Sequence, residues 1–318
     1  MQTKGTKFEE TAIIIRQEEI ADDIYSMWLR TEHIAAHAKA GQFVSVYCNE
    51  GSRLLPRPIS ICEIDRKDGA IRLVYRVAGK GTAEFSGMRT GMQLKVVGPL
   101  GNGFPQKNKK AFLIGGGIGI PPMLELAKEL DCEKQIVLGF RDELFLLEDF
   151  RNRGQIYIAT EDGSAGTEGN VLDAIRENGL DADIIYACGP TPMLRAIKEY
   201  AAEQNIECWI SMEERMACGI GACLACVCKS KEKDAHSNVK NKRICKRGTG
   251  ISCTGGRILM NMKVDLCGVT LNNPVMTASG TFGAGEEYSE FVDLNRLGAV
   301  VTKGVANVPW EGNRHACG

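Results

Sequence analysis

The first hundred residues alternate short apolar runs with polar turns. The runs QFVSVYC, RPISICEI, AIRLVYRV and MQLKVVGP are rich in valine, isoleucine and tyrosine, and glycine, aspartate and lysine separate them. β-Branched and aromatic residues between turn residues are typical of strands. Several short strands at this spacing predict a small antiparallel barrel or sandwich over residues 1–104.

From residue 105 to residue 206 the pattern becomes one of alternating strands and helices. The runs KKAFLIGGG, KQIVLGF, QIYIAT and DADIIYACGP each contain a block of apolar residues, as buried strands do. Two other stretches, PPMLELAKEL and TPMLRAIKEYAAEQ, place apolar residues at helical spacing. This alternation predicts a parallel α/β domain.

Two further segments complete the chain. Residues 207–246 are rich in cysteine and predict a small third domain. In residues 247–318 the texture changes: KRGTGISCTGGRIL has no clear period, and MNMKVDLCGVTLNNPVMTASGTFG begins like the start of a different protein. The predicted fold class is therefore β plus α/β, followed by a small cysteine-rich domain and an anomalous tail.

Composition narrows the classes of function. A net charge of −1 without a basic face gives nucleic-acid binding no electrostatic support. No run of about twenty apolar residues could span a membrane, and the first twenty residues do not resemble a signal peptide. Thirteen cysteines without a secretion signal indicate the reducing cytoplasm, where clustered thiols usually serve metal or redox chemistry.

Four cysteines have the spacing of an iron–sulfur site. Three follow the pattern C-x4-C-x2-C, and the fourth lies nineteen residues further on. This is the plant-type [2Fe–2S] pattern, whereas zinc sites more typically show two C-x2-C pairs or paired histidines. Gly219 and Gly221 would let the loop curl around the sulfurs, and Cys228 is expected to pack rather than ligate. The candidate metal ligands are Cys218, Cys223, Cys226 and Cys245.

The RPISI strand carries a candidate phosphate-binding arginine. Taken alone, it could be an ordinary edge strand interrupted by proline. A VYR strand and a Gly-Thr pair before an expected helix follow it, and an arginine with a helix N-terminus can hold a pyrophosphate. The candidate residues are Arg57, Pro58, Ile59, Ser60, Val74, Tyr75, Arg76, Gly81 and Thr82.

Two glycine turns follow apolar strands of the α/β region. GGGIGIPPM departs from the G-x-G-x-x-G fingerprint because Ile120 stands where the third glycine belongs. Either turn alone could be purely structural, but both are expected at the carboxyl ends of parallel strands, where such sheets bind ligands. The candidate residues are Gly115, Gly116, Gly117, Gly119, Cys188, Gly189 and Pro190.

In this order, the three sets of motifs resemble the ferredoxin reductase superfamily. Over residues 8–246, and especially in EERMACGIGACLACVC, the chain resembles the electron-transfer subunits of NAD-dependent dihydroorotate dehydrogenases. The resemblance implies FAD on a barrel, NAD at the glycine turns and a [2Fe–2S] cluster on the cysteines. It implies electron transfer from a catalytic FMN subunit to NAD⁺ in pyrimidine biosynthesis, within a heterotetramer of two copies of each subunit. It assigns no catalytic residue to this chain.

The tail departs from that family after Cys245. Codons can be chosen for residues 247–260 such that removing one nucleotide at the start yields Glu-Gly-Pro-Val-Phe-His-Ala-Arg-Glu-Val-Glu-Phe and a stop, the ending that the family implies. We therefore expect a one-base frameshift at this junction. From Met260 on, the chain resembles the amino terminus of the catalytic subunit, in which Ala278–Gly280 and Lys303 would correspond to residues near FMN or substrate.

The tail is expected to bind no FMN. The 59 residues from Met260 cannot close a barrel of roughly 250 residues, so residues 247–318 are predicted to be disordered. Two other functions remain open from the sequence. One is a related NAD(P)H:ferredoxin or sulfide reductase subunit, and the other is a non-catalytic module stabilised by zinc.

Overall fold

The computed structural model describes residues 6–141, 143–229, 233, 238, 240–247, 251–253, 264–266, 268–271, 276–277, 294 and 297–302. The chain divides into two compact units, residues 1–258 and residues 259–318. In the described part, no helix combines the length and the apolar character needed to cross a bilayer.

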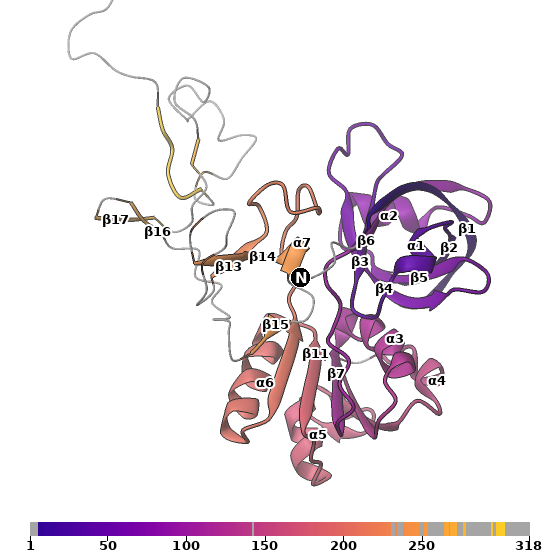
Figure 1. Cartoon of the computed structure of the whole chain (residues 1–318), viewed down its shortest axis with the longest axis vertical. Coiled ribbons are helices and arrows are strands. Elements are labelled where there is room, and N and C mark those ends of the chain that lie inside the picture. Colours follow the sequence, from indigo (N-terminus) through magenta and orange to yellow (C-terminus); the bar gives the residue numbers. More distant parts are fainter. Residues whose placement is uncertain are drawn as a thin grey trace, which may run out of the picture. The chain divides into compact units, whose positions relative to one another are not determined.

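Six antiparallel strands at the start of the chain close into a barrel, in the order β1-β2-β5-β4-β3-β6 (Figure 1). Apolar side chains on alternate positions fill its interior, among them Ile14, Leu29, Ile61 and Leu73. Because the sheet closes on itself, the prediction of a barrel is confirmed and that of a sandwich is wrong. The elements are β1 (Phe8–Ala21), β2 (Ile24–Arg30), α1 (Ile34–His37), β3 (Phe43–Val46), β4 (Arg57–Asp65), β5 (Ala70–Arg76), α2 (Lys80–Ser86) and β6 (Gln93–Leu100).

A seven-stranded sheet follows, in the order β10-β9-β8-β7-β11-β12-β15. All neighbouring pairs are parallel except β12 with β15, which confirms the predicted α/β domain. Its strands are β7 (Ala111–Gly116), β8 (Lys134–Phe140), β9 (Gln155–Thr160), β10 (Thr167–Glu168), β11 (Ile184–Cys188), β12 (Glu207–Ser211) and β15 (Ile251–Ser252). Its helices are η1 (Gly117–Gly119), α3 (Pro121–Glu129), α4 (Leu147–Phe150), α5 (Val171–Glu177) and α6 (Thr191–Glu203).

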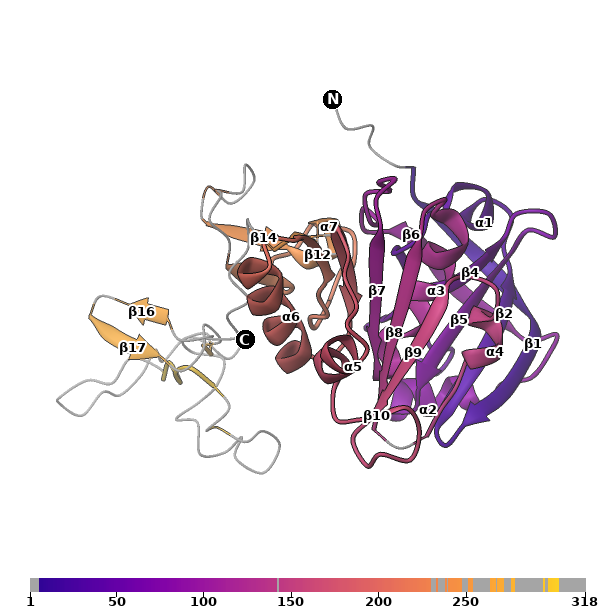
Figure 2. The same cartoon turned by 90° about the horizontal axis from the view of Figure 1, so that it is seen from below.

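Helices cover both faces of this sheet, and the central strands β7 and β11 are buried along their whole length (Figure 2). On α6, Leu194, Ile197 and Ala201 are buried at helical spacing and pack on one face together with α5. Helix α3 packs on the other face and also against β4 of the barrel, which explains why it is buried along most of its length.

Polar contacts join α3 and α4 to the barrel. The buried Glu125 on α3 accepts a hydrogen bond from the N–H of Ile64 at 2.9 Å. Arg72 on β5 pairs with Glu63 at 2.8 Å and with Asp149 on α4 at 2.6 Å. These contacts hold the α/β domain against the barrel wall.

Residues beyond β12 form smaller elements: β13 (Val227–Lys229), β14 (Asn241–Arg243) and α7 (Ile244–Arg247) in the first unit, and β16 (Val264–Leu266) and β17 (Val269–Leu271) in the second. In the second unit, β16 and β17 pair as a hairpin, and Met276 bridges Ala299 in parallel. In the first unit, β15 pairs with β12 and brings the buried Cys253 beside Cys208, whose carbonyl accepts the Cys253 N–H at 2.8 Å.

Most of the tail lies outside the described residues, and its expected disorder stays a prediction there. The same holds for the Ala278–Gly280 segment and for Lys303. Strand β15 falls within the range expected to be disordered, yet its described residues extend the sheet by one antiparallel strand.

Candidate functional site

Arg57 and Arg76 lie at one end of the barrel. In the pairing of β4 with β5, Ile61 lies opposite Leu73. Arg57 lies four residues before Ile61 and Arg76 three residues after Leu73, so both fall at the same end of the barrel. Helix α2 begins at Lys80, four residues after Arg76. Two cationic side chains at a strand end and a helix start can bind a pyrophosphate. The structure thus brings together the residues that the RPISI and VYR motifs single out.

Gly81 makes room for the Arg57 side chain. A Cβ atom at Gly81 would lie 2.5 Å from Cζ of Arg57, so any larger residue would displace the guanidinium. The Thr82 hydroxyl accepts the N–H of Ala78 at 2.9 Å and donates to the Gly79 carbonyl at 3.1 Å. The sequence pattern pointed to this hydroxyl as a phosphate ligand, whereas in the structure it caps its own turn.

The other barrel candidates differ in exposure. Pro58 is exposed and Ser60 is half-buried, whereas Ile59, Val74 and Tyr75 are buried. The Tyr75 ring stacks on Tyr25 and meets the edge of Phe85, and burial raises the pKa of its hydroxyl. The buried side chains belong to the barrel core. Of these five residues, Pro58 and Ser60 therefore remain for side-chain contact with a ligand.

The two glycine turns meet at the carboxyl ends of neighbouring parallel strands. Cys188 at the end of β11 pairs in register with Gly115 on β7. From β7 the sheet continues through β8 and β9 in one direction. It continues through β11 and β12 in the other direction, so the strand order reverses between β7 and β11. Parallel α/β sheets bind ligands at such a switch point. The expected position of both turns is thereby confirmed.

The turns pack backbone against backbone. A Cβ atom at Gly119 would lie 2.5 Å from the carbonyl carbon of Cys188 and 2.6 Å from Cα of Gly189. Gly116 instead packs against a side chain, that of Met193 at the start of α6, whose sulfur would lie 2.5 Å from a Cβ atom there. Burial raises the pKa of the Cys188 thiol to about 12, and the nearby Glu213 carboxylate acts in the same direction. Cys188 is therefore a buried, neutral thiol at the carboxyl end of β11.

The four candidate ligands lie as two pairs of thiols. Cys223 Sγ is 3.2 Å from Cys218 Sγ, and the N–H of Cys245 points to Sγ of Cys226 at 3.4 Å. The β13–β14 hairpin and α7 bring the last two together, since Ile244 donates its N–H to the Cys226 carbonyl at 2.8 Å. In the part of the chain that the structure describes, no three metal-ligating side chains converge on one point as they stand.

Hydrogen bonds favour the thiolates of Cys218 and Cys226, whereas the bond that Cys245 donates to Cys226 raises the pKa of Cys245 itself. For Cys218, burial alone would raise the pKa, but donors from Cys223 and the N–H groups of Ile220 and Ala222 lower it to about 7. For Cys226, hydrogen bonds from the Cys245 thiol and N–H lower the pKa to about 6. Iron binds thiolate and needs such donors around it. Two neighbouring pairs of thiols, with N–H donors to Cys218 and Cys226, therefore have the chemistry that a [2Fe–2S] cluster needs.

Two glycines shape the cluster-binding loop, residues 218–226. Gly219 has a φ of +65° and Gly221 a φ of +85°, conformations that side chains rarely adopt. Cys228 lies beyond the loop and packs half-buried against the apolar core, where burial raises its pKa to about 11. Its position agrees with the expectation that it packs rather than ligates.

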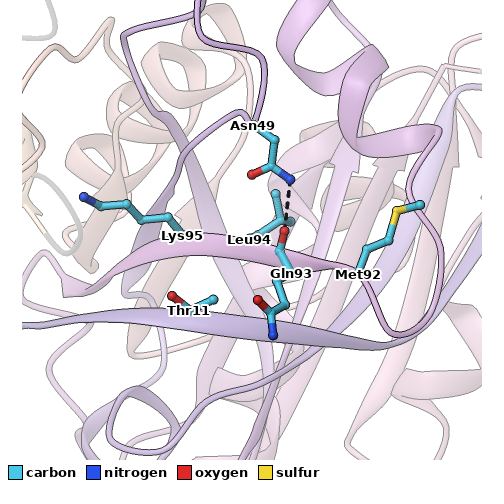
Figure 3. Close-up of a pocket in the computed structure, with 6 residues that line it drawn as sticks. All are labelled: Thr11, Asn49, Met92, Gln93, Leu94 and Lys95. Atoms are coloured by element: carbon cyan, nitrogen blue, oxygen red, sulfur yellow. Dashed lines mark hydrogen bonds between the residues drawn. The ribbon is translucent and has the colours of Figure 1, made fainter.

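A pocket of about 490 Å³ lies on the outer wall of the barrel (Figure 3). It is lined by Thr11, Asn49, Met92, Gln93, Leu94 and Lys95. Asn49 donates to the Gln93 carbonyl at 3.1 Å, and Lys95 pairs with Glu9 at 2.8 Å. None of the candidate residues lines it, so it adds no chemistry to the site.

The barrel, the switch point and the thiol loop define an oxidoreductase of the ferredoxin reductase type. A family model for the oxidoreductase FAD-binding domain matches residues 11–104, and one for the iron–sulfur cluster binding domain of dihydroorotate dehydrogenase B matches residues 213–248. A solved NADH-dependent reduced ferredoxin-NADP oxidoreductase is similar, with a TM-score of 0.68 and 28% identity over 79% of this chain and 90% of that one. A cytochrome P450 reductase from Amycolatopsis shares the fold, with a TM-score of 0.55 and 20% identity over 64% of this chain and 68% of that one.

Curated relatives give the family. A protein from Fusobacterium nucleatum is 41% identical over 72% of this chain and 93% of its own length, and one from a Geobacillus strain is 42% identical over 74% and 94%. Both are named dihydroorotate dehydrogenase B (NAD(+)), electron transfer subunit. The chain belongs to this family, and FAD, a [2Fe–2S] cluster and NAD are its cofactors.

The comparisons also bear on the tail. A family model for dihydroorotate dehydrogenase matches residues 261–316. This confirms the resemblance of the tail to a catalytic subunit. The match to the iron–sulfur domain ends at residue 248, so the change of family falls within the junction that the sequence singled out.

Proposed function

We propose that this chain passes electrons from FMN in a catalytic dihydroorotate dehydrogenase subunit to NAD⁺, in pyrimidine biosynthesis. The observation that carries the proposal is the cysteine loop, which fits a [2Fe–2S] cluster and lies in the stretch matched to the iron–sulfur domain of dihydroorotate dehydrogenase B. The curated relatives, named as electron transfer subunits of the same enzyme, support it.

Each cofactor has its own residues in this proposal. Arg57 and Arg76 hold the pyrophosphate of FAD, and the turns at Gly115–Gly119 and Cys188–Pro190 hold the nicotinamide nucleotide. FAD, when bound, exchanges single electrons with the cluster and a hydride with NAD. The cluster-binding loop packs on β3, the barrel strand next to the Arg57 strand β4, so the cluster and flavin sites are neighbours. The α3 and α4 contacts keep the switch point facing the barrel.

The partner is the catalytic FMN subunit, and the assembly is a heterotetramer of two copies of each chain in the cytoplasm. Ile220 and Leu224 support a docking surface at the cluster, since these two side chains of the cluster-binding loop are 45% and 46% exposed. A partner covering them would bring its FMN close to the iron–sulfur site and would remove their apolar surface from water.

Reconstitution tests the proposal. The purified chain, loaded with its cofactors, is mixed with the catalytic subunit, dihydroorotate and NAD⁺, and NADH formation is followed by absorbance. The proposal expects NADH only when both subunits are present. A chain that reduces ferredoxin or sulfur compounds with NADH but yields no NADH from dihydroorotate would instead be a related reductase subunit.

Arg57→Ala is expected to weaken retention of FAD by about 2–3 kcal/mol, the usual scale for a charge-assisted contact with phosphate. Flavin content after gel filtration measures the loss. Arg30→Ala is the matched control, because Arg30 is an exposed arginine at the opposite end of the barrel, where it pairs with Ala70. Equal flavin content in both variants would show that Arg57 is only a surface residue.

We also propose the one-base frameshift at codon 247. Truncation after Lys246, followed by Glu-Gly-Pro-Val-Phe-His-Ala-Arg-Glu-Val-Glu-Phe, is expected to improve solubility and to leave flavin reduction by NADH unchanged. The change removes a stretch that matches part of a larger barrel protein, and strands of such a fragment are expected to lack neighbours. It also removes β15 and uncovers the edge of β12, which the restored segment would have to cover.

Yield of dispersed protein and the rate of flavin reduction measure the outcome for the restored chain against the full chain. Truncation at Lys246 without the restored segment is the control for the exposed β12 edge. A restored chain that aggregates more than the full chain, or that loses its cluster, would contradict the frameshift. The genomic DNA across codons 244–262 gives the same answer independently.

A further inference from the structure

Ser45 carries a buried hydroxyl without a hydrogen-bond partner among the described residues. Its side chain is on β3, where Val44 and Val46 point into the barrel core. Ser45 and Phe43 point the other way, out of the barrel, and Phe43 joins the apolar core that also contains Cys226 and Cys245. Only 2% of Ser45 is exposed, and its Oγ atom has no hydrogen-bond partner in the described part of the chain. A buried hydroxyl left unpaired costs free energy.

The hydroxyl faces the cluster-binding loop. A Cβ atom at Gly219 would lie 2.6 Å from Oγ of Ser45 and 3.4 Å from Cδ1 of Leu100. Gly219 directly follows Cys218, one of the four cysteines of the cluster site. A side chain at residue 219 would collide with this hydroxyl, so glycine lets the loop that holds the sulfurs pack directly against it.

We propose that the Ser45 hydroxyl donates a hydrogen bond to a sulfur of the [2Fe–2S] site, on the Cys218 side, and thereby raises its reduction potential. This inference rests on the proposed function. Reduction adds negative charge to the cluster, and a hydrogen bond to sulfur stabilises that charge. Ser45 is a positioning and tuning residue, since it acts through the cluster and touches neither NAD nor substrate.

The Ser45 hydroxyl differs from the other hydrogen-bond donors to the sulfurs in the domain that it comes from. The N–H groups of Cys223 and Cys245 that point to the sulfurs belong to the cysteine-rich segment itself. Ser45 belongs to the flavin barrel, so its hydrogen bond forms only while the loop is docked on β3. The potential of the cluster is thereby tied to its docking beside the flavin domain.

A redox titration of the full chain, loaded with FAD and cluster, tests the inference. Ser45→Ala is expected to lower the midpoint potential of the cluster, followed by its EPR signal, while iron, sulfide and flavin contents and the flavin potential stay unchanged. The expected size is about a tenfold change in the ratio of oxidised to reduced cluster, or about 59 mV for a one-electron couple. Ser45→Cys, which offers a weaker donor, is expected to give a smaller shift.

Ser26→Ala is the matched control. Ser26 is equally buried but lies on β2, across the barrel from β3, where its Oγ accepts from Arg72 at 2.9 Å. Its replacement is expected to leave the cluster potential unchanged. A hyperfine measurement in deuterated water adds a second signature, because one exchangeable proton near the cluster should disappear in Ser45→Ala.

Several outcomes would overturn the inference. An unchanged cluster potential and an unchanged exchangeable proton in both Ser45 variants would do so, as would a shift of the flavin potential alone, which would assign the hydroxyl to FAD. If Ser45→Ala loses iron, Ser45→Cys decides the matter with the same measurements. A parent chain that holds no iron and sulfide would instead contradict the proposed function itself.

Discussion

Replacing Cys223 by serine is expected to abolish electron transfer between the catalytic subunit and NAD⁺ while leaving FAD in place. Cys223 is one of the four proposed ligands, and its N–H and thiol point to Cys218 Sγ at 3.3 and 3.2 Å. A serine hydroxyl ligates iron poorly in place of a thiolate, so the variant loses one ligand although it keeps the N–H group of residue 223. The flavin site is built on a separate barrel. Reduction of artificial two-electron acceptors by NADH should therefore survive.

The visible spectrum and the iron content measure this outcome, and Cys228→Ser is the control. Cys228 lies two residues beyond Cys226 and packs against the core, so its replacement is expected to keep the cluster. A Cys223→Ser protein that still bleaches and recolours as a [2Fe–2S] protein would show that the ligand assignment is wrong.

Gly119→Ala is expected to slow reduction of the flavin by NADH at least about a hundredfold. The new Cβ atom would lie 2.5 Å from the carbonyl carbon of Cys188 and 2.6 Å from Cα of Gly189. Both are backbone atoms, which cannot rotate away as a side chain can. The two turns must then separate by about 1 Å, and a displacement of that size between reacting groups can cost about a factor of 100 in rate. Rapid mixing of the oxidised chain with NADH measures the rate of flavin bleaching.

Gly51→Ala controls for the substitution itself, because a Cβ atom at Gly51 meets nothing within 4 Å. It is expected to leave the rate unchanged. A Gly119→Ala protein that is reduced as fast as the parent chain would mean that the paired turns do not hold the nicotinamide nucleotide.

Local patterns in the sequence predicted the elements and their order. Alternating apolar residues indicated the strands of the barrel, and glycine after a buried strand indicated both turns at the switch point. The C-x4-C-x2-C spacing is read directly from the order of residues along the chain. It could therefore be recognised before any contact between Cys226 and Cys245 was known. The change of texture after Cys245 similarly indicated a tail of a different family, which the match at residues 261–316 confirms.

Contacts between distant segments could not be predicted in this way. Periodicity indicates which residues of β3 point out of the barrel, but it does not indicate that Gly219 lies against Ser45. For the same reason the sequence did not reveal that Glu125 on α3 would accept the Ile64 N–H. The Thr82 hydroxyl has several partners within reach, and only the geometry of its own turn decides among them. The pairing of β15 with β12 is a further long-range contact of this kind.

The most direct test of the electron-transfer account is an EPR and visible spectrum of the purified chain after anaerobic addition of NADH. The account predicts that the flavin absorbance falls and that the paramagnetic signal of a reduced [2Fe–2S] cluster appears in the same sample. This result requires the nucleotide, flavin and iron–sulfur sites to work in series within one chain. A colourless protein that contains zinc and shows neither change would contradict the account.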